Sequence, residues 1–107
     1  MPTRTPTTPD PWPFDQPRDA AAITLRRIVL PKNGEPPKPV LYVSHDTDDH
    51  SWQFLDGDHV RTEDAAVVGM ETMLNHDPTL AEIADLPPGW TAIRAAPSKP
   101  WRRSRRG

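Results

Sequence analysis

The sequence contains no cysteine, only five glycines and no long apolar segment. Without cysteine the chain can form neither a disulfide framework nor a thiolate zinc site, and it has no thiol nucleophile. The longest apolar runs, 28–30 and 40–43, are far too short to span a membrane, and residues 1–18 lack the apolar core of a signal peptide. All five glycines are isolated, which excludes a glycine-rich phosphate loop. These absences predict a cytoplasmic protein that binds neither a membrane nor a cofactor.

Proline, by contrast, is abundant, with 15 residues in the chain and six of them among the first 17. Because proline lacks a backbone donor and fixes φ, neither a helix nor a strand ladder propagates through such a segment. We therefore predict that residues 1–19 are disordered, with Trp12 and Phe14 as the large apolar groups that could still dock on the folded part. The rest divides into a single domain over 20–96 and a flexible basic tail over 97–107.

The pattern of apolar residues in this domain predicts an α+β fold, in which a small, mostly antiparallel sheet carries two short helices on one face. The period of two residues along a strand puts Trp52 and Phe54 on the same face. Strands are expected at 40–44, at 52–55, at 65–69 as a buried strand, and at 90–95.

The two helices are expected on either side of Asp77-Pro78, because proline excludes its predecessor from the helical region. The first starts at Met70, where apolar residues recur at i, i+3 and i+4. The second runs to Asp85, and Thr79 and Glu82 have the spacing of a capping box at its start.

Residues 20–30 form the first ordered element, which we interpret as a strand with a bulge because β-branched residues are frequent in it. A short helix is the alternative, since short apolar runs fit both structures. The connection that follows, 31–39, contains the hairpin signal Asn33-Gly34 among prolines that prevent pairing.

Charge is distributed unevenly along the chain. Residues 45–85 contain eleven carboxylates and one arginine, a formal charge of −10, whereas the rest of the chain has twelve basic and four acidic residues, a formal charge of +8. Such asymmetry is informative about partners rather than about fold. We predict an acidic surface that binds another protein with a basic site, such as a toxin or a nuclease. Its expected residues are Asp46, Asp48, Asp49, Asp56, Asp58, Glu63 and Asp64.

The basic tail is the candidate site for a nucleic acid, which would be a weak and nonspecific partner. Arginines neutralise phosphates, and a tryptophan among them can stack on a base. The alternatives are a solubilising tail and a tail that folds back on the acidic segment. The candidate residues are Trp101, Arg102, Arg103, Arg105 and Arg106.

Three histidines around the acidic segment, His45, His50 and His59, are the weak candidates for a metal site, because imidazole and carboxylate groups bind zinc, iron and manganese. No spacing among them is diagnostic, and an acidic turn whose aspartates cap backbone donors explains the same residues. We therefore predict no metal. The neighbouring Ser44 and Asp46 complete a set of triad residue types, but neighbours on a strand point to opposite faces. The protein is accordingly predicted not to be an enzyme, with a metal-dependent enzyme as the less favoured alternative.

Several short motifs occur together between Val40 and Arg94. They are W-x-F-x-x-G from Trp52, the apolar strand at 67–68, the step Asn75-His76-Asp77-Pro78, and the turn Leu86-Pro87-Pro88-Gly89. In this arrangement the chain resembles small bacterial proteins of the immunity protein 33 type, a domain of unknown function found beside polymorphic toxins. The resemblance implies a non-enzymatic, immunity-like module. The acidic loop, the proline-rich start and the arginine-rich end depart from that pattern.

Overall fold

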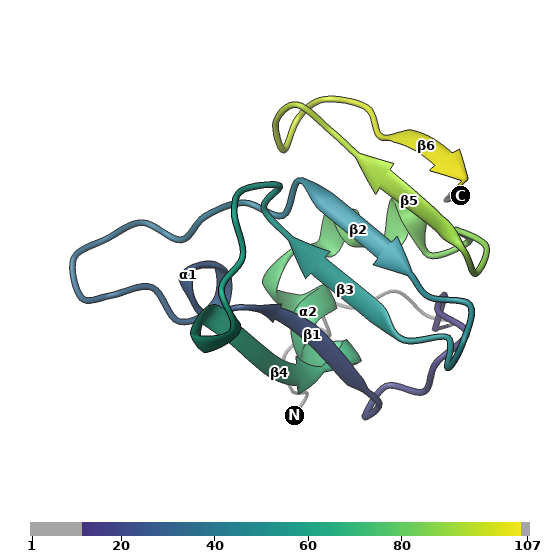
Figure 1. The fold of residues 1–107 in the computed structure, drawn as a ribbon, viewed down its shortest axis with the longest axis horizontal. Helices are drawn as coiled ribbons and strands as arrows, with labels where there is room; N and C mark the ends of the chain where they lie inside the picture. The colour runs from purple at the N-terminus through teal and green to yellow at the C-terminus, as the bar shows by residue number, and fades with distance from the viewer. Residues whose placement is uncertain (1–11, 106–107) are drawn as a thin grey trace, which may run out of the picture.

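The computed structural model describes residues 12–105, which form a six-stranded sheet with the strand order β4-β1-β3-β2-β5-β6 (Figure 1). The pair β1–β3 is parallel, and the other four neighbouring pairs are antiparallel. This confirms the predicted α+β fold with a mostly antiparallel sheet. The strands are β1 (Ala21–Leu25), β2 (Tyr42–His45), β3 (Trp52–Leu55), β4 (Ala65–Gly69), β5 (Trp90–Ile93) and β6 (Arg102–Arg105).

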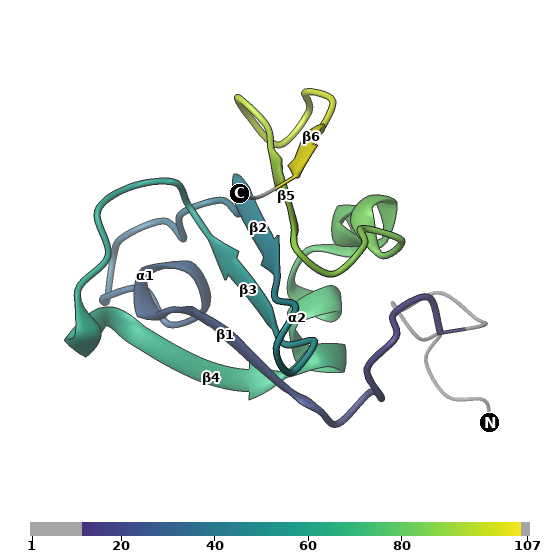
Figure 2. The same ribbon diagram turned by 45° about the vertical axis from the view of Figure 1, so that its right-hand side comes forward.

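One face of the sheet is covered by the helix α2 (Met70–His76) and the 3₁₀ helix η2 (Pro78–Ile83), which lie on the same side of it (Figure 2). The hydrophobic core lies between these two helices and the sheet. Trp52 and Phe54 are fully buried on this face, as the strand period predicts, while Gln53 between them is not. The helical contribution to the core consists of Met70, Met73, Leu74, Leu80 and Ile83.

The predicted helix boundary at Asp77-Pro78 is confirmed, but its cap is different from the one expected. The Asp77 carboxylate accepts a hydrogen bond from the Thr79 backbone N–H at 3.1 Å, so Asp77 caps η2 in place of the Thr79–Glu82 capping box. Pro78 occupies the first turn, where its missing N–H costs nothing.

The first element, predicted as a strand over 20–30, is a strand only as far as Leu25. It continues as the single helical turn α1 (Arg26–Val29). Leu25 and Ile28 are both fully buried, and a spacing of three residues brings two side chains to one side in a helix but not in a strand. The turn also directs Arg27 away from the core.

Two further expectations about the strands are wrong. β4 is an edge strand beside β1 rather than a buried one, and its Val67 is 70% exposed. Asn33-Gly34 forms a turn, with Gly34 at φ +87° and a hydrogen bond from Glu35 N to Lys32 O at 2.9 Å, but it does not join paired strands. The chain leaves α1 by this turn and enters β2, which pairs with β3 and β5 rather than with β1.

The two ends of the described chain are parts of the fold, contrary to the predicted domain limits. Phe14 is only 7% exposed and its ring meets that of Trp52 edge to face at 5.0 Å, so residues 12–19 are docked. A segment without ladder hydrogen bonds is held here by burial of its aromatic side chains. Arg102–Arg105 form β6 along β5 rather than a flexible tail. Residues 1–11 and Arg106 lie outside the described residues.

Length and apolarity together decide whether a helix can cross a membrane. None of the helices within residues 12–105 meets both conditions.

Candidate functional site

The face of the sheet that α2 and η2 do not cover contains a groove of about 830 Å³. Its floor consists of alternate residues of β2 and β3, in the cross-strand pairs Tyr42–Leu55 and Ser44–Gln53. Gly89 lies on its rim at φ +87°, and a Cβ at this position would lie 2.8 Å from Thr47 Cγ2. The positive φ is what favours glycine at this position, where the two loops approach each other closely.

Three carboxylates line the groove, and none of the basic residues between 12 and 105 does. Asp46 and Asp48 belong to the loop before β3, and Asp58 belongs to the turn after it. Asp46 also organises its loop, since it accepts hydrogen bonds from Ser44 Oγ and Ser51 Oγ at 3.1 Å each. Asp48 and Asp58 are exposed. The groove therefore presents negative charge at both ends of β3.

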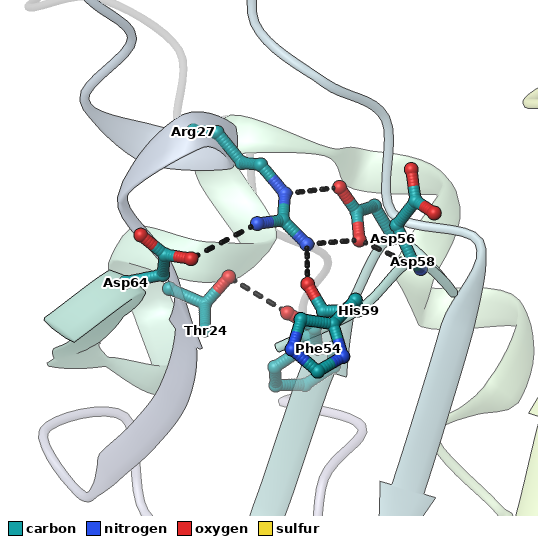
Figure 3. A network of polar contacts seen from close by, with 7 residues as sticks. All are labelled: Thr24, Arg27, Phe54, Asp56, Asp58, His59 and Asp64. Atoms are coloured by element: carbon teal, nitrogen blue, oxygen red, sulfur yellow. Dashed lines mark hydrogen bonds and ion pairs between the residues drawn. The ribbon is translucent and has the colours of Figure 1, made fainter. Parts of the chain in front are cut away.

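The other members of the predicted acidic surface do not line this groove. Arg27 of α1 binds Asp56 through two bonds, from Nε to Oδ2 at 2.5 Å and from Nη2 to Oδ1 at 2.9 Å, and its Nη1 reaches Asp64 Oδ2 at 3.3 Å (Figure 3). The hydrogen bond from Arg27 lowers the pKa of Asp56. Asp49 accepts from Ser51 N in its own loop, and the exposed Glu63 pairs with Arg61 at 3.7 Å. The predicted single surface is thus divided.

The Arg27–Asp56 pair yields a prediction about stability and pH. We expect Asp56→Asn to lower the free energy of unfolding by about 1.5–3 kcal/mol near neutral pH, the range for hydrogen bonds to charged groups. The pKa of Asp56 in the folded protein lies below its ordinary value of 3.8. The carboxylate therefore contributes its stability above that pH and loses it as the pH falls through the folded-state pKa. Urea denaturation at a series of pH values measures this.

The difference between wild type and Asp56→Asn should shrink as the solution is acidified. Glu63→Gln is the matched control, because its carboxylate pairs only with an exposed arginine at 3.7 Å and should change stability little at any pH. A difference that stays constant from neutral to acidic pH would show that the charge of Asp56 is not what stabilises the fold.

A second cluster lies at the opposite surface of β2, where Asp15, His45 and His50 each bring one ligand atom within 4.8 Å of the others. The structure thus brings together two of the three histidines considered from the sequence. His59 is elsewhere: it is exposed, and its backbone carbonyl accepts from Arg27 Nη2 at 2.9 Å (Figure 3). The sequence alone does not indicate Asp15 as a member of this cluster, because Asp15 lies about 30 residues before the histidines in the chain. Its position depends on the docking of the neighbouring Phe14 against Trp52.

The triad residue types at 44–46 do not converge, as the sequence predicts. Ser44 lines the groove and donates to Asp46 Oδ1 at 3.1 Å, whereas the His45 ring lies on the covered side, where its Nδ1 is 2.6 Å from Leu86 O. The hydroxyl and the imidazole are therefore on opposite faces of β2.

No family model, curated protein or solved structure matches the chain. The resemblance to the immunity protein 33 type consequently stays a prediction.

Two of the residues predicted to bind a nucleic acid, Trp101 and Arg103, contact the domain itself. Arg103 Nη2 contacts Asp85 Oδ1 and Glu82 O, both at 2.8 Å, and its hydrogen bond lowers the pKa of Asp85. The Arg94 guanidinium covers the half-buried Trp101 ring, with its Cζ 4.3 Å from the ring centroid. Of the alternatives for this segment, folding back on the acidic region agrees with the Arg103–Asp85 pair. Arg102 and Arg105 are exposed on β6.

Proposed function

We propose that the protein is a non-enzymatic binding module whose groove holds a basic segment of another protein. The observation that carries this proposal is the composition of the groove: carboxylates at both ends of β3, no basic residue among the described residues that line it, and Tyr42 and Leu55 on the floor. Opposite charge attracts a lysine- or arginine-rich segment, and the aromatic and aliphatic floor offers the apolar contact on which affinity depends.

The charge would act mainly on the rate of encounter. Carboxylates around a concave surface steer a cationic partner and raise its association rate, and this effect weakens as salt is added. The resemblance to immunity proteins supports a basic toxin or nuclease as that partner. The exposed Ile23, Val67 and Ile93 on the same face of the sheet extend the apolar area beyond the groove.

We expect Asp48→Lys combined with Asp58→Lys to slow association with the partner by about 10-fold or more at low ionic strength and to flatten its salt dependence. The measurement has two steps. Immobilised wild-type and variant proteins first capture ligands from a nuclease-treated bacterial lysate, and the retained protein is identified and purified. Stopped-flow mixing at several salt concentrations then gives its association rate with each variant.

Asp19→Lys combined with Glu35→Lys is the matched control, because it changes the net charge equally at exposed carboxylates that do not line the groove. This control should retain the partner that the groove variant loses. Equal association of all three proteins would show that the groove is not the binding surface. A ligand that disappears on nuclease treatment would instead indicate the alternative, nucleic-acid binding, for which Arg102 and Arg105 are the exposed candidates among the described residues.

A further inference from the structure

We propose that Asp15, His45 and His50 form a binding site for a divalent transition-metal ion, of which zinc fits the ligand set best. This inference is independent of the proposed groove function. Two imidazoles and one carboxylate are the ligands of zinc sites that keep an open coordination position, and nitrogen ligands disfavour magnesium and calcium. Each residue contributes one possible ligand atom, a histidine nitrogen or a carboxylate oxygen, and these three atoms lie within 4.8 Å of one another.

The hydrogen bonding of His45 carries the argument furthest. Its Nδ1 lies 2.6 Å from the Leu86 carbonyl oxygen, which can only accept, so Nδ1 holds a proton and donates it. In a neutral ring Nε2 then has a free lone pair. A ligating histidine in a metal site is held in this same way, with its second nitrogen donating to a backbone carbonyl.

The free nitrogen of His45 is buried and faces a carboxylate. His45 is 2% exposed, and Nε2 lies 3.0 Å from Asp15 Oδ2, a contact that is an ion pair only if the ring carries a second proton. Two acceptors at this distance repel each other, unless a cation lies between them or the ring takes up a second proton. A buried polar atom left in this state is costly, which points to a positively charged occupant.

The carboxylate is oriented as well. Trp52 Nε1 donates to Asp15 Oδ1 at 2.9 Å, which leaves Oδ2 to face both histidines, at 3.0 Å from His45 Nε2 and 3.7 Å from His50 Nδ1. The Trp52 ring also stacks on the His45 ring, with centroids 4.0 Å apart and an angle of 16°. One buried tryptophan therefore fixes the direction of two of the three ligands, as an outer shell does in metal sites.

These distances suit a tetrahedral ion with small adjustments. Zinc bonds of about 2.0–2.1 Å place neighbouring ligand atoms about 3.3 Å apart. His50 can supply the movement, because its side chain is 53% exposed on a loop. Asp15 and His45 also line an open surface hollow of about 310 Å³ together with Leu86 and Pro88, which leaves room for a further ligand such as water.

The test is a calorimetric titration. Zinc chloride is added to the full-length protein after a chelator has removed any metal from it. We expect one ion per chain. His50→Ala and Asp15→Asn should each weaken binding by at least the 10- to 100-fold that loss of even an outer-shell partner typically costs. Asp15→Asn keeps an oxygen that accepts from Trp52, so it perturbs the fold least. His59→Ala and His76→Ala are the matched controls, since both remove an exposed histidine outside the cluster.

A second measurement separates a metal ion from a proton as the occupant. Imidazole signals in ¹H–¹⁵N NMR spectra should shift for His45 and His50 on addition of zinc, while those of His59 and His76 should stay in place. Near-UV circular dichroism checks that the variants are folded. Binding that is equal in His50→Ala and in the controls, or His45 signals that ignore zinc, would overturn the proposal and leave a protonated His45 paired with Asp15. The groove proposal would be untouched by that result.

Discussion

Replacement of Arg94 by alanine is expected to lower the free energy of unfolding by about 3–5 kcal/mol, because it removes the cation from a buried network. The Arg94 side chain is 1% exposed. It donates to Val40 O at 3.0 Å, to Thr79 Oγ1 at 2.9 Å and to Asp77 Oδ2 at 2.9 Å, and its guanidinium covers the Trp101 ring. One side chain thus joins the approach to β2, the junction of α2 with η2, and the segment that leads into β6.

Small domains have a total stability of about 5–15 kcal/mol, so this loss should be visible as a large shift of the urea midpoint followed by far-UV circular dichroism. Arg94→Lys keeps the charge but not the planar fork, and should fall between wild type and alanine. Arg61→Ala is the control, because Arg61 is exposed and pairs with the exposed Glu63 at 3.7 Å, an interaction worth less than about 1 kcal/mol. If Arg94→Ala unfolds like this control, the network does not hold the fold together.

Arg94 also shows where prediction from the sequence ends. The pattern of 90–95 indicates a strand, and β5 is there, but nothing local distinguishes Arg94 from a surface arginine at the end of a strand. Its burial arises from partners between 3 and 54 residues away in the chain. Local signals did predict what local physics decides, namely the Trp52–Phe54 face and the helix boundary at Asp77-Pro78.

The candidate sites divide in the same way. The cluster of Asp15, His45 and His50 could not be predicted, because it forms only when a proline-rich segment docks on the domain. The composition of that segment alone indicates disorder. The acidic surface was predicted from the count of carboxylates, but a count does not include the tertiary partner. Arg27 engages Asp56 and Asp64 from a helical turn that lies 29 and 37 residues earlier in the chain. One of the alternatives that the charge asymmetry left open, a C-terminal segment that folds back on the acidic region, agrees with the Arg103–Asp85 pair.

Replacement of Phe14 by alanine is expected to lower the free energy of unfolding by about 3 kcal/mol, the lower end of the range for phenylalanine truncation, because Phe14 lies at the edge of the core. Its ring contacts Trp52 at 5.0 Å, Phe54 at 6.4 Å and Trp12 at 5.5 Å between centroids. Loss of these contacts removes the one buried side chain among residues 12–19, which directly precedes Asp15.

The same substitution should also weaken zinc binding, although Phe14 is not a ligand. Asp15 follows it directly, and a segment released from the core no longer presents Oδ2 to His45. Urea denaturation and zinc calorimetry on Phe14→Ala measure the two effects, with Leu30→Ala as the control, because Leu30 is 69% exposed and its truncation should change stability by no more than about 0.5 kcal/mol. Stability equal to that of Leu30→Ala would show that residues 12–19 are not part of the folded domain. Lost stability with unchanged zinc affinity would place the ion elsewhere, because a site that includes Asp15 must depend on the aromatic residue that holds Asp15 against β2.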